Sequence, residues 1–181
     1  MLRKAVENRI ELKTSSCYVD TSLIIARYKP SDILYEDSNA FFKSNFDFII
    51  SPITLVELHC VLSRVRSELN VPMDAEPLID TLVAFIIKDC KLRLLSKGYY
   101  VKKSFSQECR MSLEYYVATR FAEQLGLRTL DMLHLSYAWI LKKSFGVELF
   151  VTGDEEILEK AEDIKKSLGI KVSHPKQLVR T

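Results

Sequence analysis

The sequence predicts an α/β protein built around one central sheet. Five short runs of β-branched and aliphatic residues have the length of strands, and they lie at 16–20, 46–51, 91–95, 148–152 and 170–173. Two of these runs are continuously apolar rather than alternating, which is typical of strands buried on both faces of a parallel sheet. Helical patterns fill the segments between the runs, so we expect helices to cover the sheet.

The helical segments have recognisable boundaries. The clearest begins after Ser51, which is placed to cap it, with Pro52 at the first helical position and Asn70 as a stop. Its leucine and valine residues recur every three or four positions, the spacing of a face that packs on a core. The other predicted helices span 74–90, 106–126, 129–144 and 154–169. The last two end in lysines and a nearby glycine, as helices commonly do.

Length and composition favour one compact domain. The chain has 181 residues, of which 48% are hydrophobic, so it has enough apolar material for a sizeable core. Its net charge of +2 excludes a polycation or an acidic-tail protein, and any affinity for nucleic acid has to come from local patches. We expect residues 1–14 to be an N-terminal extension, in which "RIEL" would add an edge strand, and residues 15–181 to be the domain.

The sequence also predicts a compartment. No apolar run reaches the roughly 18 residues of a membrane span, and the first residues lack the apolar block of a secretory signal. We therefore expect a cytoplasmic protein without a membrane partner. The spacing of its four cysteines matches no zinc or redox motif, so we expect reduced core thiols; only a hyperthermophilic source would leave a disulfide open as an alternative. These cysteines are Cys17, Cys60, Cys90 and Cys109.

Four acidic residues lie near the starts of helices or the ends of strands. Asp20 and Asp154 each follow a strand run, whereas Glu57 and Asp131 lie in the first turns of predicted helices. Each has an ordinary explanation when it is taken alone. Asp20 and Asp154 would cap helices, Asp131 would stabilise the dipole of a helix capped by Thr129, and Glu57 would be a solvated side chain.

The geometry of a parallel sheet brings these four residues together. The carboxyl ends of all its strands meet at one edge, where loops and helix starts surround a common crevice. Four carboxylates in one crevice repel each other unless a cation lies among them. With Ser22 and Thr152 as supporting hydroxyls and no cysteine or histidine at matching positions, the ligands are all oxygen, which favours Mg²⁺ or Mn²⁺ over zinc. Such ions promote the hydrolysis of phosphodiesters.

The same residues carry a family resemblance. The ordered segments "YVDTSLIIA", "SPITLVEL", "LDMLHLSYA" and "FVTGDEEI" resemble the four acidic motifs of PIN-domain nucleases, most closely those of the VapC-type toxins. The resemblance covers about residues 16–173, and it implies an α/β/α sandwich and a metal-dependent ribonuclease. Asp20, Glu57, Asp131 and Asp154 would then be the catalytic metal carboxylates, supported by Ser22 and Thr152.

The resemblance also implies partners. PIN enzymes act on RNA and are often homodimers, and the toxin members pair with a small antitoxin whose tail blocks the active site. One segment, at about 70–126, departs from the compact toxin pattern because it is longer and contains two helical patterns. We describe it as a helical insertion, and it bears on the toxin assignment more than on the fold or the chemistry.

Several further residues are candidates for the same function. Arg64 shares a helix face with Glu57, and Arg128 precedes the helix of Asp131, so either would hold a phosphate or balance the acidic cluster. Lys102 and Lys103 lie among aromatic residues, which suits RNA, although an ordinary exposed loop explains them as well. His134 lies three residues after Asp131, near an apolar helix face, and we assign it a structural role.

Two other functions fit the sequence less well. A PIN scaffold retained only for binding RNA or protein would have no need to tolerate four mutually repelling carboxylates. A phosphatase with Asp20 as its nucleophile lacks a second aspartate two residues later, where Ser22 stands. RNA that is bound but never cleaved would favour the first alternative.

Overall fold

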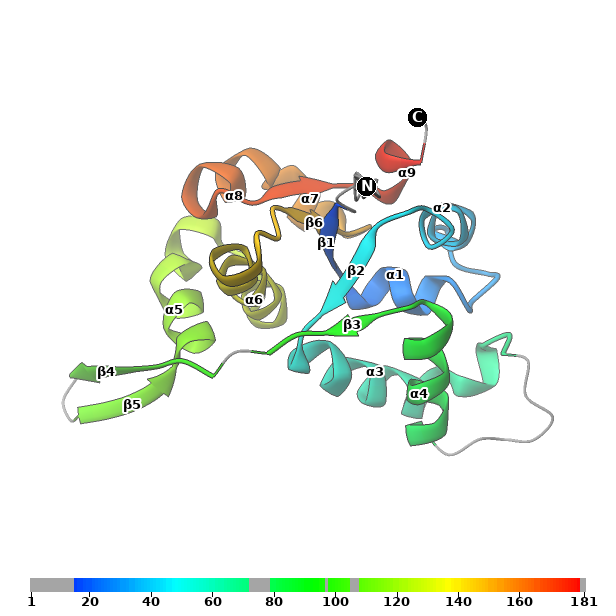
Figure 1. Ribbon diagram of the computed structural model, residues 1–181, viewed down its shortest axis with the longest axis horizontal. Helices are drawn as coiled ribbons and strands as arrows, with labels where there is room; N and C mark the ends of the chain where they lie inside the picture. The colour runs from blue at the N-terminus through cyan, green and yellow to red at the C-terminus, as the bar shows by residue number, and fades with distance from the viewer. Residues whose placement is uncertain (1–14, 72–78, 97, 105–107, 180–181) are drawn as a thin grey trace, which may run out of the picture.

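The protein is described by a computed structural model, which covers residues 15–71, 79–96, 98–104 and 108–179. Its core is a parallel sheet of five strands in the order β3-β2-β1-β6-β7, so β1 lies at the centre (Figure 1). The strands are β1 Ser16–Val19, β2 Asp47–Ile50, β3 Arg93–Leu94, β6 Leu149–Val151 and β7 Lys171–Ser173. All five lie within the predicted runs, which confirms the predicted α/β class with a central parallel sheet.

Helices cover both faces of this sheet. Four of them, α1 Thr21–Ala26, α2 Tyr35–Phe41, α3 Pro52–Val65 and α4 Ile79–Asp89, share one hydrophobic core with the strands. A second core on the other face is formed with α5 Leu113–Leu125, α6 Thr129–Phe145, α7 Glu155–Glu159 and α8 Ala161–Leu168. Because side chains alternate along a strand, Cys17 and Val19 enter the first core and Tyr18 the second. The result is the predicted three-layer α/β/α sandwich.

The remaining elements lie outside these layers or at their edges. A 3-10 turn, Arg66–Glu68, continues α3, and the short helix α9, Pro175–Leu178, follows β7. Strands β4 Tyr100–Ser104 and β5 Glu108–Ser112 form an antiparallel hairpin that projects beyond α5 (Figure 1). No helix among the described residues is long and apolar enough to cross a membrane. All four cysteines, two of them buried, are free thiols.

Three predicted helices differ from the observed ones. The helix predicted at 106–126 begins only at Leu113, because residues 108–112 pair with β4 and Ser112 has the extended backbone of a helix cap. The helix predicted at 154–169 is two helices, because the backbone leaves the helical region at Lys160. Of the helix predicted at 74–90, residues 79–89 are helical and 74–78 lie outside the described residues.

Other predictions need smaller corrections or stay open. The strand predicted at 91–95 is shorter than expected, and the sequence patterns missed α2, α9 and the hairpin. Gly146 and Gly169 end α6 and α8 with left-handed backbone (φ 72° and 68°), as their sequence positions indicate. The proposed extension at 1–14, including "RIEL", lies outside the described residues. The division of the chain into extension, domain and insertion stays a prediction.

Candidate active site

An acidic cavity lies at the carboxyl edge of the sheet. All four predicted carboxylates line it, and its volume is about 310 Å³. Asp20 and Asp154 follow β1 and β6, which are hydrogen-bonded neighbours. Asp131 lies in the first turn of α6, whereas Glu57 lies in the second turn of α3 and not in the first turn that the sequence predicted, because α3 begins at Pro52. The parallel sheet therefore brings together residues that are as much as 134 positions apart in the sequence.

Asp20 is held by two hydroxyl groups. Its Oδ2 accepts hydrogen bonds from Ser22 Oγ at 2.8 Å and from Thr152 Oγ1 at 2.6 Å. The side chain makes no capping bond to α1, although Asp20 occupies the N-cap position. The two hydroxyls that the sequence singled out thus fix this carboxylate, and helix capping does not explain it.

Asp154 does cap a helix. Its Oδ1 accepts from the backbone N–H of Glu156 at 2.8 Å and of Ile157 at 3.3 Å at the start of α7. Its own N–H donates to Thr152 Oγ1 at 3.0 Å, so one threonine links Asp154 to Asp20. Capping and metal binding are compatible here, because the cap occupies only one of the two carboxylate oxygens.

Glu57 is fixed by a chain of hydrogen bonds that runs from the cavity into the core. Its Oε2 accepts from Thr21 Oγ1 at 2.5 Å and lies 2.6 Å from His134 Nε2. His134 Nδ1 lies 2.7 Å from the hydroxyl of Tyr18, which in turn lies 2.6 Å from Ser51 Oγ. A carboxylate only accepts, so Nε2 donates to Glu57, while Nδ1 and the Tyr18 hydroxyl share the next hydrogen bond of the chain.

His134 is therefore a site residue that the sequence assigned only to packing. It is 2% exposed, as a core residue would be, but both ring nitrogens point to polar partners. One nitrogen lies close enough to Asp20 and Glu57 for the three side chains to ligate an ion together. Because both nitrogens are already hydrogen-bonded, positioning Glu57 describes the role of His134 better than ligation does. Its place one helical turn after Asp131 was the signal available in the sequence.

These contacts leave a consistent pattern. In Asp20, Glu57 and Asp154, one carboxylate oxygen is hydrogen-bonded and the other has no partner among the described residues. None of the three free oxygens is fully buried. Among the described residues, the one fully buried side-chain nitrogen or oxygen that lacks a hydrogen-bond partner is Nη1 of Arg27. Fixed carboxylates with one free, accessible oxygen each are a suitable ligand set for a hard divalent cation.

Charge repulsion is visible at Asp131. Burial raises its pKa to about 6, and the negative charges of Asp154, Asp20 and Glu156 add to the effect, with His134 opposing them. Glu57 shows the opposite shift. Burial raises its pKa, but the hydrogen bond and charge of His134 and the hydrogen bond from Thr21 outweigh it and hold the pKa below its usual value. The negative charge of Asp131 is therefore incompletely balanced within the cavity.

Asp32 is a fifth acidic residue at this cavity, and no sequence pattern pointed to it. Its Oδ1 accepts from the backbone N–H of Leu34 at 3.0 Å, which shapes the loop before α2. Asp32, Leu34 and Asp154 also line a neighbouring cavity of about 520 Å³. The acidic cavity therefore opens along this loop into a longer depression.

The predicted basic contacts lie elsewhere. Arg64 is exposed and does not line the acidic cavity, so it does not balance the carboxylates directly. Arg128 caps the start of α6 by position and forms an exposed ion pair with Glu156 at 3.3 Å, which explains its charge without a ligand. Lys102 and Lys103 lie on β4, in the hairpin.

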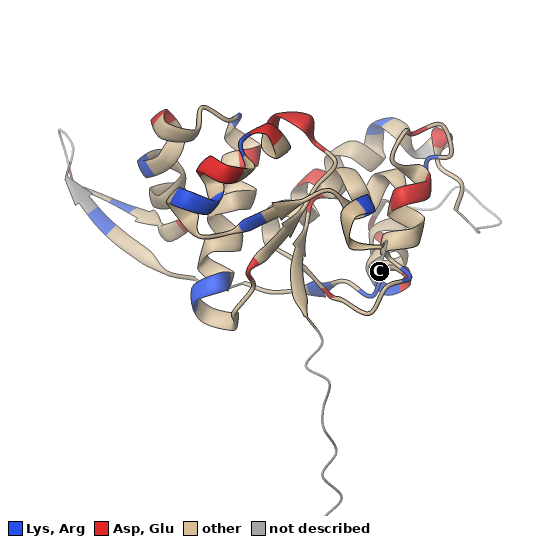
Figure 2. Ribbon diagram, turned by 90° about the horizontal axis from the view of Figure 1, so that it is seen from above, with Lys and Arg blue, Asp and Glu red and all other residues tan. Residues whose placement is uncertain are grey.

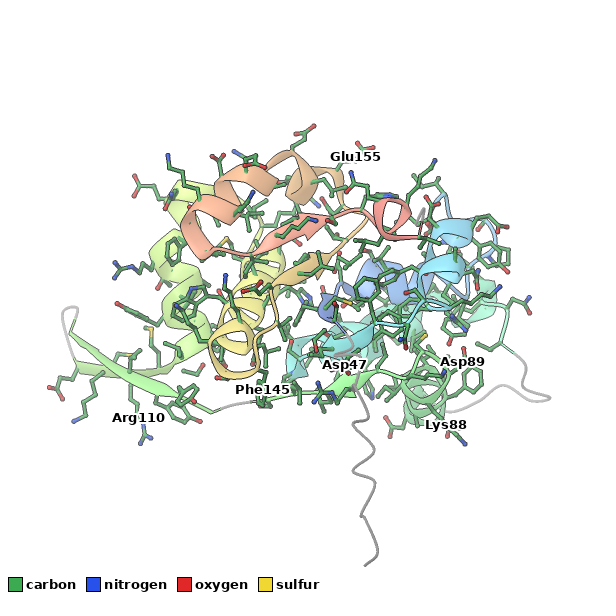
Figure 3. The ribbon with its side chains drawn as sticks, turned by 45° about the horizontal axis from the view of Figure 1, so that its top comes forward. Asp47, Lys88, Asp89, Arg110, Phe145 and Glu155 are labelled. Atoms are coloured by element: carbon green, nitrogen blue, oxygen red, sulfur yellow. The ribbon has the colours of Figure 1, made fainter. Side chains whose placement is uncertain are left out.

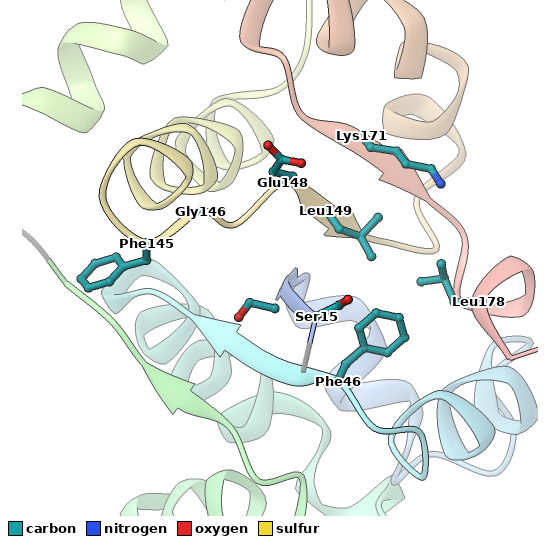
Figure 4. Close-up of a pocket in the computed structure, with 9 residues that line it drawn as sticks. Ser15, Phe46, Phe145, Gly146, Glu148, Leu149, Lys171 and Leu178 are labelled. Carbon is teal, nitrogen blue, oxygen red and sulfur yellow. The ribbon is translucent and has the colours of Figure 1, made fainter. Parts of the chain in front are cut away.

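A separate cavity of about 500 Å³ lies at the opposite edge of the sheet (Figure 4). Phe46, Leu149 and Leu178 make much of its lining apolar, and the charged residues among the described ones that line it are Glu148 and Lys171. Parallel sheets bind their ligands at the carboxyl edge, and the chemistry of this second cavity offers no cluster of ligands. We therefore place the active site at the acidic cavity.

Comparison with known proteins agrees with this arrangement. The sequence matches the PIN domain family over residues 17–163, which include all four carboxylates. The chain is similar to the crystal structure of PAE2754 from Pyrobaculum aerophilum, with a TM-score of 0.50 and 16% identity over 92% of this chain and 93% of that one. At this identity the likeness describes the fold alone. No curated protein matches the chain significantly.

Proposed function

Because the chain belongs to the PIN domain family, whose members are generally metal-dependent nucleases, we propose that it hydrolyses RNA phosphodiester bonds with bound Mg²⁺ or Mn²⁺. The observation that carries the proposal is the acidic cavity, in which three carboxylates are each fixed by one oxygen while the other stays free. A purely structural cluster would gain nothing from leaving these oxygens unpaired.

The residues present fit such an ion. Asp20, Glu57, Asp131 and Asp154 would hold it. The pKa of Asp131 is raised first by burial and then by the repulsion of its acidic neighbours, and a cation would relieve that repulsion. When bound, the ion supplies an activated water and neutralises charge on the leaving oxygen. Oxygen-only free ligands favour Mg²⁺ or Mn²⁺ over zinc.

The protein side chains would prepare the site for that chemistry. Ser22 and Thr152 fix the orientation of Asp20, and His134 and Thr21 fix Glu57. Asp131 has no such fixed hydrogen bond among the described residues and, being partly protonated near pH 6, would exchange its proton for the cation. The depression beside Asp32 and Leu34 offers room for the nucleotides next to the cleaved bond.

Site variants test this function. We expect Asp20→Asn and Glu57→Gln to abolish cleavage of a labelled single-stranded RNA in Mn²⁺ while the circular dichroism spectrum stays that of the wild type. Asp163→Asn, at an exposed position of α8 away from the cavity, is the matched control and keeps full activity. Cleavage by Asp20→Asn at the wild-type rate would refute the assignment, and RNA binding without any cleavage would favour a binding module.

The narrower toxin assignment stays a prediction from the resemblance of the motifs. It includes a small antitoxin partner and a homodimer. A short gene that overlaps this one and encodes a DNA-binding protein would support it. Copurification of that gene product with this chain, and loss of RNA cleavage in the complex, would test it directly.

A further inference from the structure

The hairpin carries a basic and aromatic surface that the active site does not use. We call Tyr100, Lys102, Arg110, Trp139 and Lys143 the hairpin surface. We propose that it binds single-stranded RNA, with the rings stacking on bases and the cations contacting phosphates. This rests on the proposed function, because it assigns a second contact for the same substrate. Figure 2 shows basic positions on the hairpin.

Two cations face each other across the hairpin. Lys102 on β4 and Arg110 on β5 are directly opposite in register, so their side chains leave the same face of the hairpin. Like charges in directly opposite positions destabilise a strand pair. Neither forms an ion pair within the described part of the chain, and Glu108, the acid nearest in register, bonds to neither. A phosphate group between the two cations would relieve the repulsion.

An aromatic ring lies on the same face. The guanidinium of Arg110 lies 4.5 Å from the ring centroid of Tyr100, and Tyr100 is 59% exposed. Stacking on a ring preorders a guanidinium and leaves its N–H groups free to bind phosphate. Figure 3 shows Arg110 extending from the hairpin at one end of the molecule. An exposed tyrosine beside such an arginine is a typical platform for a nucleobase.

A cavity continues this surface onto α6. It has a volume of about 430 Å³ and lies between the start of β4 and the second half of α6, where Trp139 and Lys143 line it. Lys143 Nζ lies 5.7 Å from the Trp139 ring, which repeats the pairing of a cation with an aromatic ring. None of the described residues that line this cavity carries a carboxylate. Its size and chemistry suit a planar base with an attached phosphate.

The base of the hairpin is held in place. Its two strands pair over five positions, and Leu113 N–H at the start of α5 donates to Tyr99 O at 2.8 Å. Asp131 and Lys143 lie 12 residues apart on α6, about 18 Å along a helix. One RNA strand several nucleotides long would therefore reach from the acidic cavity to the hairpin surface.

The charge of the surface argues against other occupants. A second copy of the chain, docked symmetrically here, would bring the same three cations against each other, which costs free energy. An acidic peptide would satisfy the cations but offers no row of planar groups for Tyr100 and Trp139. Single-stranded RNA combines both features, and stacking tolerates any base sequence.

Binding measurements in a cleavage-inactive background test the proposal without requiring turnover. In the Asp20→Asn protein, fluorescence anisotropy with a labelled poly(U) oligonucleotide would follow binding. We expect Tyr100→Ala with Arg110→Ala to weaken binding about 10- to 100-fold, and Lys102→Ala to lower the salt slope of log K by about 1. Tyr100→Phe keeps the ring and should bind like the parent protein. Lys88→Ala is the charge control, because Lys88 lies on α4 at the other end of the molecule (Figure 3).

The outcomes separate this inference from the proposed function. Affinity within twofold of the parent in the double variant would overturn the inference, even if Asp20→Asn abolishes cleavage as expected. Lost RNA binding in the double variant supports the inference, even if the wild-type protein cleaves nothing. Unchanged RNA binding together with a dimer that the double variant disrupts, measured by sedimentation, would identify a contact between copies and overturn the RNA assignment.

Discussion

At the scale of single residues, the active site combines fixed carboxylates with one that is strained by charge. Asp20, Glu57 and Asp154 are each anchored by hydroxyl, imidazole or backbone donors. Asp131 has a pKa raised to about 6 by burial and by its acidic neighbours. The protein thus gives up some stability at Asp131, which is common where a site is built to bind a ligand.

Asp131→Asn should therefore stabilise the metal-free protein. With a folded pKa of about 6 against an ordinary value of 3.8, the charged carboxylate opposes folding above about pH 6. After allowance for its partial exposure, we expect a gain of about 1 kcal/mol in unfolding free energy at neutral pH. Thermal denaturation in EDTA measures it.

The pH dependence provides the control for Asp131→Asn. The difference from wild type should shrink as pH falls from 6 towards 4, because the folded state takes up a proton over this range and the unfolded state does not. It should vanish below the ordinary pKa of 3.8, where the carboxyl is protonated in both states. If Asp131 served only the helix dipole, the substitution would lower the melting temperature at neutral pH instead.

His134 should act through Glu57. Removing its ring in His134→Ala leaves Glu57 without its imidazole donor and Tyr18 without one of its hydrogen-bond partners, so we expect Mn²⁺ affinity to fall about 10- to 100-fold. Calorimetric titration with Mn²⁺ measures this loss. His134→Gln, whose amide can donate to Glu57, should recover part of it. If both variants bind Mn²⁺ as tightly as the wild type and only their stability is lower, the role of His134 is limited to packing.

At the scale of elements, the loop after β6 packs closely against the loop before α2. A Cβ atom at Gly153 would overlap the side chain of Leu34, in the loop that precedes α2. Gly153 therefore allows this loop to pack beside Thr152 and Asp154, which hold the active site. The segment from Thr152 to Asp154 therefore requires a glycine for packing at its centre, in addition to the hydroxyl and the carboxylate that serve the active site.

Gly153→Ala should disturb this packing. We expect it to destabilise the fold by about 1 kcal/mol, the low end for overpacking because the obstructing atoms end the half-buried Leu34 side chain, and to lower nuclease activity, because the overlap pushes on the Asp154 loop. Leu34→Ala, which removes the obstructing side chain, should restore much of both when combined with Gly153→Ala. A double-mutant cycle by chemical denaturation measures the coupling, and strictly additive effects would contradict this explanation.

The elements differ in how well the sequence predicts them. The central strands and the carboxyl edge followed from continuous apolar runs and the rules of parallel sheets, so the convergence of Asp20 and Asp154 was predictable. The hairpin was not, because residues 108–112 alternate weakly and are stabilised by pairing with β4 rather than by their own pattern. Asp32 and the polar contacts of His134 were missed because both depend on tertiary packing.

At the scale of the whole molecule, the core on one face of the sheet supports the active site. Tyr18, which bonds to His134, stacks on Phe150 of β6 with ring centroids 5.3 Å apart. Both rings are fully buried in the core that α5–α8 share with the sheet. The core on the other face has its own buried aromatic group around Phe41, on α2. Packing on the two faces should therefore affect function unequally.

Matched core substitutions test this asymmetry. We expect Phe150→Leu and Phe41→Leu each to lower the unfolding free energy by about 1–2 kcal/mol, since each removes a buried ring and its aromatic contacts. Only Phe150→Leu should also lower the rate of RNA cleavage, because it loosens Tyr18 and through it His134. Equal losses of activity in two equally destabilised variants would show that the two cores do not differ in this way.

The central claim is that the four carboxylates form one divalent-metal site that carries out RNA hydrolysis. The single-turnover cleavage rate of a labelled single-stranded RNA, measured as Mn²⁺ is titrated into the metal-free protein, tests it most directly. We predict no cleavage in EDTA, a rate that rises with Mn²⁺ to a plateau, and no cleavage at any Mn²⁺ concentration for Asp20→Asn. A rate in EDTA equal to the rate in saturating Mn²⁺ would contradict the claim.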